Sequence, residues 1–144
     1  MQYEYIITYI GAPIIWKSQL QMEIALSSTE SEYTSLLYAL RKAIPLMHML
    51  RKINNLGFNI NNSALTISCR VFEDNSGALE IAKVYKYHPH TKYLNVKLHH
   101  FRKYVERENI MIKKIGTENQ YANFLTKLVN KPTLVKLRKC VMGW

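Results

Sequence analysis

The chain has 144 residues, of which 48% are hydrophobic, so it can form one domain with an apolar core and has little room for two. Its net charge of +10 favours polyanionic partners, with nucleic acid first among them, over the alternative that the charges only solvate the surface. Cys69 and Cys140 are too far apart in sequence for a zinc knuckle, and no signal peptide or membrane span is apparent. We therefore expect an intracellular protein, in cytoplasm or nucleus, with two free thiols.

Hydrophobic periodicity and turn signals predict the order of the elements. We expect a hairpin over 3–16, a helix over 27–53, a strand over 64–72, a short helix over 75–83, a loop over 84–93, a helix over 94–108, a strand over 110–112, and two closing helices over 118–128 and 132–141. Ser27 and Glu30 fit a capping box, and Pro45 should kink or split the long helix. This order of elements is typical of an α/β fold that begins with an antiparallel hairpin.

Asp74 is the only aspartate in the chain, and it lies where the core strand is expected to give way to a short helix. Ligands gather at the carboxyl ends of strands in α/β sheets, and Glu32, early in the long helix, can reach the same place. Mg²⁺ often binds one or two carboxylates together with substrate phosphates, so the pair could hold this ion. Spacing alone leaves another reading open, because the helix dipole also favours Glu30 and Glu32 near a helix N-terminus.

Five ordered motifs carry a more specific signal: Trp16-Lys17-Ser18, residues 25–33, residues 73–78, residues 90–93 and residues 118–127. Together they resemble the ribonuclease H domain at the carboxyl end of copia-type LTR-retrotransposon polyproteins, over nearly the whole chain. The resemblance implies one RNase H-like α/β domain over 1–144, truncated at its N-terminus, with a mixed sheet flanked by helices. It also implies an ancestral Mg²⁺-dependent activity that cuts the RNA strand of RNA/DNA hybrids.

The resemblance implies a catalytic set of four carboxylates that hold two Mg²⁺ ions. Glu32 and Asp74 match two of them, whereas the aspartate of the first, central strand has no counterpart in this chain. The late aspartate falls on Asn123, whose amide is a neutral and weaker ligand. Glu73 is a poor substitute, because neighbouring strand residues point to opposite faces. We therefore expect relics of a metal site in an inactive relative, with marginal stability because two strand edges face a gap.

A basic and aromatic stretch is the expected contact surface for RNA/DNA hybrid or other nucleic acid. Its main candidates are Lys86, His88, His90, Lys92, Arg102 and Lys103. Zinc is disfavoured because no cysteine or carboxylate accompanies these histidines at a ligand spacing. A second basic cluster over 127–139 is consistent with binding or with a solvated helix face. Other segments of a Pol polyprotein are further expected partners. A non-catalytic nucleic-acid-binding module and a nuclease completed by an upstream acid remain as alternatives.

Overall fold

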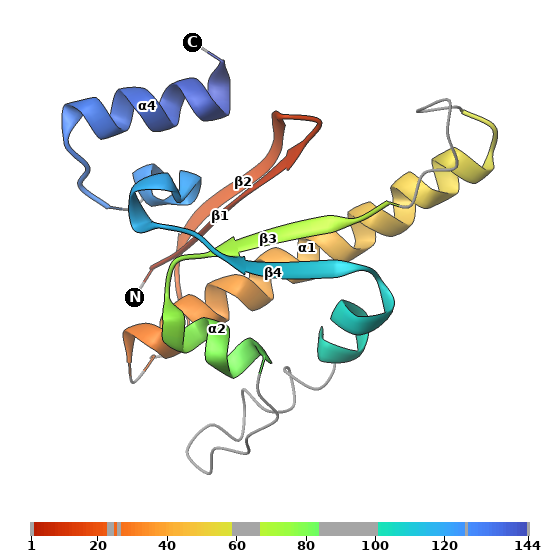
Figure 1. The fold of residues 1–144 in the computed structure, drawn as a ribbon, viewed down its shortest axis with the longest axis horizontal. Helices are drawn as coiled ribbons and strands as arrows, with labels where there is room; N and C mark the ends of the chain where they lie inside the picture. The colour runs from red at the N-terminus through yellow and green to blue at the C-terminus, as the bar shows by residue number, and fades with distance from the viewer. Residues whose placement is uncertain are drawn as a thin grey trace.

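The fold is described from a computed structural model of the chain (Figure 1). The structure describes residues 2–22, 25, 27–58, 67–83, 101–125 and 127–143. In chain order the elements are strands β1 (Gln2–Tyr9) and β2 (Ala12–Leu20), helix α1 (Ser28–Asn55), strand β3 (Cys69–Glu73), helix α2 (Ser76–Lys83), a helical stretch over 101–107, strand β4 (Ile110–Lys114), the short 3₁₀ helices η2 (Thr117–Asn119) and η3 (Tyr121–Leu125), and helix α4 (Lys131–Met142). The α/β class expected from the sequence is confirmed.

The described strands form two separate sheets of two strands each. β1 and β2 pair antiparallel, with Tyr9 opposite Ala12 beside the turn, as expected for the hairpin. β3 and β4 run parallel, with Glu73 opposite Lys114 at their carboxyl ends. A parallel pair needs a long crossover connection, and both α2 and the helical stretch over 101–107 lie on it.

The hairpin turn consists of Ile10 and Gly11, both with left-handed backbone conformations, at φ angles of 51° and 79°. Two-residue turns of this kind match the twist of the flanking strands and favour Asn-Gly. Gly11 adopts this conformation without a steric cost. Ile10 is β-branched and 77% exposed, so its side chain gains little packing to offset the strain of its backbone.

Replacing Ile10 with Asn should stabilise the protein by about 1 kcal/mol, because Asn tolerates the left-handed conformation and no buried contact is lost. Urea denaturation, which gives the free energy of unfolding, measures this change. Ile14→Asn is the matched control, since Ile14 is also exposed but, unlike Ile10, does not have a positive φ angle. The control should gain nothing, and an Ile10→Asn variant no more stable than the wild type would contradict the prediction.

Helix α1 begins at the predicted position, and Ser27 accepts a hydrogen bond from the backbone N–H of Glu30 at 3.1 Å. Pro45 lies inside α1 but does not split it, so that part of the expectation is wrong. Both Pro45 and Arg41, whose carbonyl has no N–H partner at position 45, are exposed residues. The adjacent Ile44 is buried in the core and helps to hold the two halves in line.

The single helix expected over 118–128 is wrong, because η2 and η3 stand in its place. Side chains bond to the backbone in this region: Asn123 donates to the carbonyl of Thr117 at 2.8 Å, and Gln120 donates to the carbonyl of Phe72 at 3.0 Å. Such bonds compete with a continuous helix. The expected core strand is shorter and begins at Cys69. The loop expected over 84–93 and the expected helix start at 94 lie outside the described residues.

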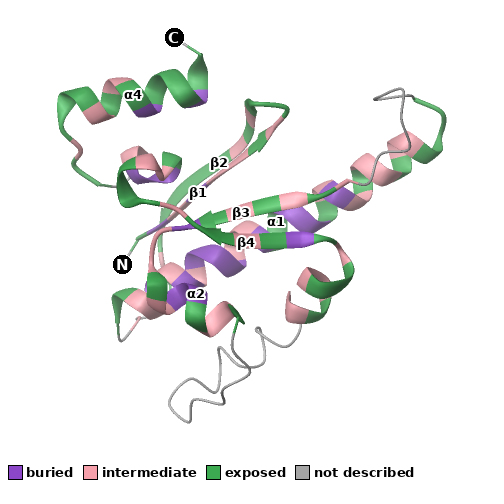
Figure 2. Cartoon of the chain, in the orientation of Figure 1, coloured by how far each residue is buried: buried purple, intermediate pink, exposed green. Residues whose placement is uncertain are grey.

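One core cluster joins α1 and α2 to the inner face of the β3–β4 sheet. Its buried members are Tyr33, Leu36, Leu37, Leu40, Ile44, Met47, Ala78 and Ile110. Figure 2 shows buried residues running along α1. The same helix also packs against β1, where the rings of Tyr3 and Tyr38 stack with centroids 4.4 Å apart. Because α1 contacts both sheets, it holds them in place relative to each other.

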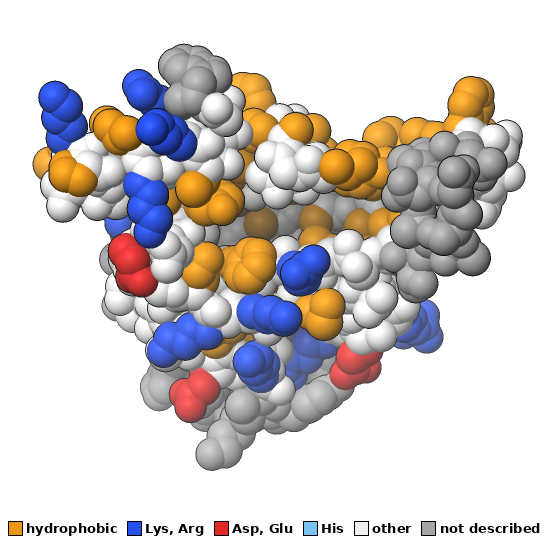
Figure 3. Space-filling view, turned by 45° about the horizontal axis from the view of Figure 1, so that its top comes forward, with side chains coloured by type: hydrophobic (Ala, Val, Ile, Leu, Met, Phe, Trp, Pro, Cys, Tyr) orange, Lys and Arg blue, Asp and Glu red, His pale blue; other side chains and the backbone are white. Residues whose placement is uncertain are grey.

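A groove of about 350 Å³ lies between the two sheets, and we call it the strand groove. One wall is β1 over residues 4–9, the other is residues 68–74 in and around β3, and the floor is α1 from Glu32 to Leu50. Figure 3 shows a hollow in this face with hydrophobic side chains on both sides. Among the described strands, none lies between β1 and β3.

Candidate metal centre and nucleic-acid surface

The acidic end of the strand groove is built by the first turns of α1 and the end of β3. Asn75 organises the residues after β3: its backbone N–H donates to the carboxylate of Glu73, and its side-chain oxygen caps α2 by accepting from the N–H of Ala78, both at 3.0 Å. Gly77 lets α2 approach α1, because a Cβ atom there would lie 2.8 Å from the side chain of Thr29. The Glu73 to Ala78 segment therefore fixes the end of β3 beside α1.

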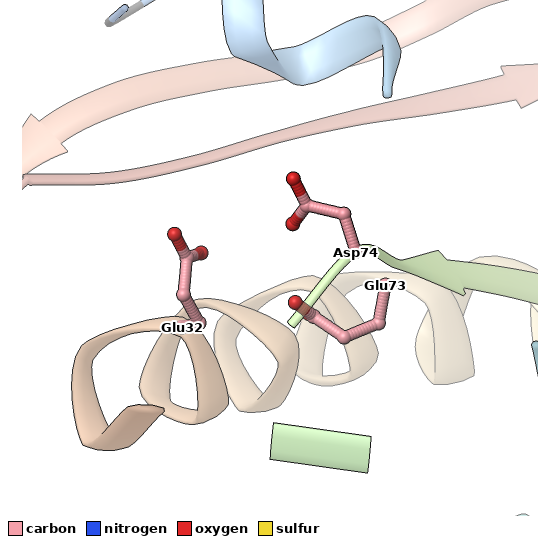
Figure 4. Close-up of side chains that lie close together, drawn as sticks. All are labelled: Glu32, Glu73 and Asp74. Atoms are coloured by element: carbon pink, nitrogen blue, oxygen red, sulfur yellow. The ribbon is translucent and has the colours of Figure 1, made fainter. Parts of the chain in front are cut away.

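Three carboxyl groups converge at this end of the groove. One oxygen from each of Glu32, Glu73 and Asp74 lies within 4.8 Å of the other two. In Figure 4, Glu32 extends from α1, and Glu73 and Asp74 approach it from the end of β3. The predicted proximity of Glu32 and Asp74 is confirmed, so Glu32 belongs to an acidic cluster as well as to the first turns of α1.

Glu73 was expected to point away from Asp74, and this expectation is wrong. Strand β3 ends at Glu73, so Asp74 lies beyond the strand, where the alternation of side chains no longer applies. Glu73 is only 5% exposed and turns inward to the cluster. The position of Asn75, a typical helix-capping residue, was the signal that the strand would end before Asp74.

Burial and mutual repulsion disfavour the charged forms of two of these acids. The pKa of Glu73 is raised to about 7, mainly by burial; the hydrogen bond from Asn75 opposes the shift, and the nearby charges of Glu32 and Asp74 add to it. Burial also raises the pKa of Glu32, with Lys127 opposing the shift and Glu4 adding to it. Near neutral pH, Glu73 is therefore divided between its protonated and charged forms.

The ammonium group of Lys127 compensates part of this negative charge. Its Nζ lies 3.7 Å from a carboxylate oxygen of Glu32 and 3.9 Å from one of Asp74. It also donates to the side-chain oxygen of Asn123 at 2.9 Å. From the sequence, Lys127 is recognisable only as a member of a general basic cluster, because its spacing does not connect it to residues so distant along the chain.

Asn123, expected in place of a late acid, is buried and joins the cluster through its amide nitrogen. Nδ2 donates to the Thr117 carbonyl and lies 3.5 Å from a carboxylate oxygen of Asp74, while its oxygen is engaged by Lys127. The three carboxylates offer hard oxygen ligands that fit one divalent cation such as Mg²⁺. Asn123 and Lys127 do not add the negative charge that a second dication would need.

The predicted nucleic-acid surface is described only in part. Lys86, His88, His90 and Lys92 lie outside the described residues. Arg102 is half-buried and donates to the carbonyl of Ile81 at 2.8 Å, so it braces the end of α2, whereas Lys103 is exposed.

A second basic surface, which was not predicted from the sequence, lies on the outer face of the β3–β4 sheet. Arg70 pairs in register with Met111, and Phe72 pairs with Lys113. All four are exposed, with Phe72 at 44% and Met111 at 43%. We call these four residues the outer sheet face. Figure 3 shows Lys and Arg side chains gathered below the hollow with hydrophobic side chains among them.

The fold and the acidic cluster define an α/β protein with a candidate cation site at the carboxyl end of a parallel strand. Comparison with curated proteins adds a particular relationship. Over 134 residues, the chain is 32% identical to the retrovirus-related Pol polyprotein from transposon TNT 1-94 of Nicotiana tabacum. It is 26% and 25% identical, each over 126 residues, to those from transposons RE2 and RE1 of Arabidopsis thaliana. The chain is therefore related to retrotransposon Pol polyproteins.

These matches cover 87–92% of the chain but only 8–9% of each relative. The relationship concerns one segment of a much longer polyprotein, and the names of the relatives do not specify what that segment does. No family model and no solved structure matches the chain. Among the described helices, none has the length and apolar character needed to cross a bilayer.

Proposed function

We propose that this chain is a degenerate ribonuclease H-type segment of a retrotransposon Pol polyprotein, which keeps part of a metal site and lacks robust hydrolysis. The observation that carries the proposal is the convergence of Glu32, Glu73 and Asp74 within 4.8 Å at the end of β3. Two further findings support the proposal. The chain is related to Pol polyproteins over most of its length, and its motifs resemble those of their RNase H domain.

The charge of the site explains the proposed loss of hydrolysis. Phosphodiester cleavage by two metal ions needs both ions close together, and each needs anionic ligands. Here one of the three acids has a pKa of about 7, and Lys127 already contributes a positive charge to the same space. The cluster is thus suited to one Mg²⁺ or Mn²⁺ ion, held with the help of a substrate phosphate. That ion would supply charge for binding a phosphate.

The outer sheet face supports a second candidate function, a non-catalytic nucleic-acid-binding module. Arg70 and Lys113 can contact phosphates, and the exposed ring of Phe72 between them is available for stacking on a base. Phosphate contacts position a duplex without reading its sequence, which suits an RNA/DNA hybrid. A net charge of +10 favours the same partner.

Incubation with an RNA/DNA hybrid and Mg²⁺ or Mn²⁺ tests both candidates, with Asp74→Asn as the matched control. We expect no cleavage above the level of the control, together with hybrid binding that weakens steeply as salt increases. Cleavage by the wild type that Asp74→Asn abolishes would overturn the proposed inactivity. Binding that survives in an Arg70→Glu, Lys113→Glu double variant would remove the outer sheet face as its location.

A further inference from the structure

The strand groove has the features of a site for one extended polypeptide strand. Both of its walls are β-strands, and neither has a sheet partner on its groove side within the described ranges. Unpaired strand edges present N–H and C=O groups that readily pair with an added strand. The floor includes small side chains at Ala39 and Ala43, one turn apart on α1, which leave room for side chains from above.

The hydrogen bonds of β3 identify which of its groups face the groove. Cys69 donates its N–H to Asn109, and Glu73 accepts from Ile115, so these strand residues bond toward β4. Alternation then directs the backbone groups of Arg70 and Phe72 to the groove. Consistent with this, the carbonyl of Phe72 accepts a hydrogen bond from the side chain of Gln120, which also lines the groove.

The two walls run in opposite directions. Glu4, near the start of β1, acts electrostatically on Glu32, and Glu32 also lies beside Asp74 at the end of β3. The start of β1 and the end of β3 therefore share the acidic end of the groove, as their arrows in Figure 1 also show. A single inserted strand could pair antiparallel with β1 and parallel with β3, which would join the two sheets into one.

We propose that the strand groove binds an extended segment from outside this chain, inserted antiparallel to β1 and parallel to β3 with its carboxyl end at the acidic cluster. The occupant is a stretch of roughly five to seven residues, matched to the length of β3, with β-branched or other apolar residues facing α1. The matched segment makes up only 8–9% of the Pol polyproteins related to this chain, and the remaining polypeptide is the expected source. This inference does not depend on nuclease ancestry.

The test uses the full chain and a capped peptide of alternating valine and threonine, about seven residues long, with a lysine added at each end. We expect the peptide to slow amide hydrogen exchange at Arg70 and Phe72 and along β1 by about tenfold or more. The same peptide with a central proline lacks a needed N–H and should have no effect. Protection at the outer edges of β2 or β4 instead, or no protection at all, would overturn the proposal.

Two variants locate the binding. Ala39→Phe fills the floor of the groove and should abolish the protection, whereas Ala12→Phe, at an exposed position of β2 outside the groove, should leave it unchanged. Gln120→Ala removes the side chain that occupies the Phe72 carbonyl and should leave peptide affinity equal or higher. Circular dichroism checks that each variant is folded. Weaker binding by folded Gln120→Ala, or full binding by folded Ala39→Phe, would contradict insertion in the groove.

Discussion

Glu73→Gln should remove most of the loss of stability that the wild-type protein shows between about pH 4.5 and pH 7 in the presence of a chelator. The pKa of Glu73 is raised to about 7 in the folded protein from an ordinary value of 4.5, mainly by burial. The folded state therefore binds the proton more tightly than the unfolded state. The stabilisation is fully present below pH 4.5 and is lost as the pH rises through 7.

The expected size of this effect is on the order of 3 kcal/mol, because one pKa unit corresponds to about 1.4 kcal/mol. Gln resembles the protonated acid and can still accept the hydrogen bond from Asn75. Glu73→Gln should accordingly match the wild type at pH 4 and exceed its free energy of unfolding at pH 8. Urea denaturation at several pH values gives both quantities. Glu80→Gln, on the exposed side of α2, is the control and should leave the pH profile unchanged.

Lys127→Gln should bind Mn²⁺ on the order of tenfold more tightly than the wild type, because its ammonium group no longer competes with the ion. Lys127 lies within 4 Å of both Glu32 and Asp74, in the space that a cation bound by them would occupy. Without metal the variant should be less stable by about 1 kcal/mol, since Lys127 is partly exposed and its ion pairs are screened.

Isothermal titration with Mn²⁺ measures the affinity, and the melting temperature with and without Mn²⁺ gives an independent readout. Lys131→Gln is the matched control, because it removes the same charge from an exposed position at the start of α4. Equal Mn²⁺ affinity in the wild type and in Lys127→Gln would show that the lysine does not compete for the site. An equal gain in Lys131→Gln would show a general effect of net charge.

Local signals predicted most elements because each depends on neighbouring residues. Ser27 caps α1, the hairpin follows from its turn residues, and α4 begins within one residue of its expected position at Pro132. The prediction of one helix over 118–128 was wrong because the structure of this segment depends on distant residues. Its residues bond to partners elsewhere, such as the carbonyl of Phe72, and apolar spacing along a segment does not register such contacts.

The candidate site, like the fold, was predictable from the sequence only in part. Asp74 and Glu32 were identifiable as a pair from the strand end, the helix start and the family resemblance. Glu73 and Lys127 were not, because the direction of Glu73 depends on where β3 ends, and Lys127 reaches the cluster only through the course of the chain after β4. The outer sheet face could not be predicted from the sequence either, because its residue pairs arise from the register of β3 with β4.

The sequence alone determined the α/β class, the basic charge and the Glu32 and Asp74 pair. These follow from composition, local periodicity and motif order. Only the tertiary structure decided that Glu73 joins the acids, that Lys127 neutralises part of their charge, and that a groove over α1 lies between the edges of β1 and β3. The physical reason is that charge compensation and edge pairing depend on distances between segments far apart in sequence, which the packing of α1 against both sheets sets.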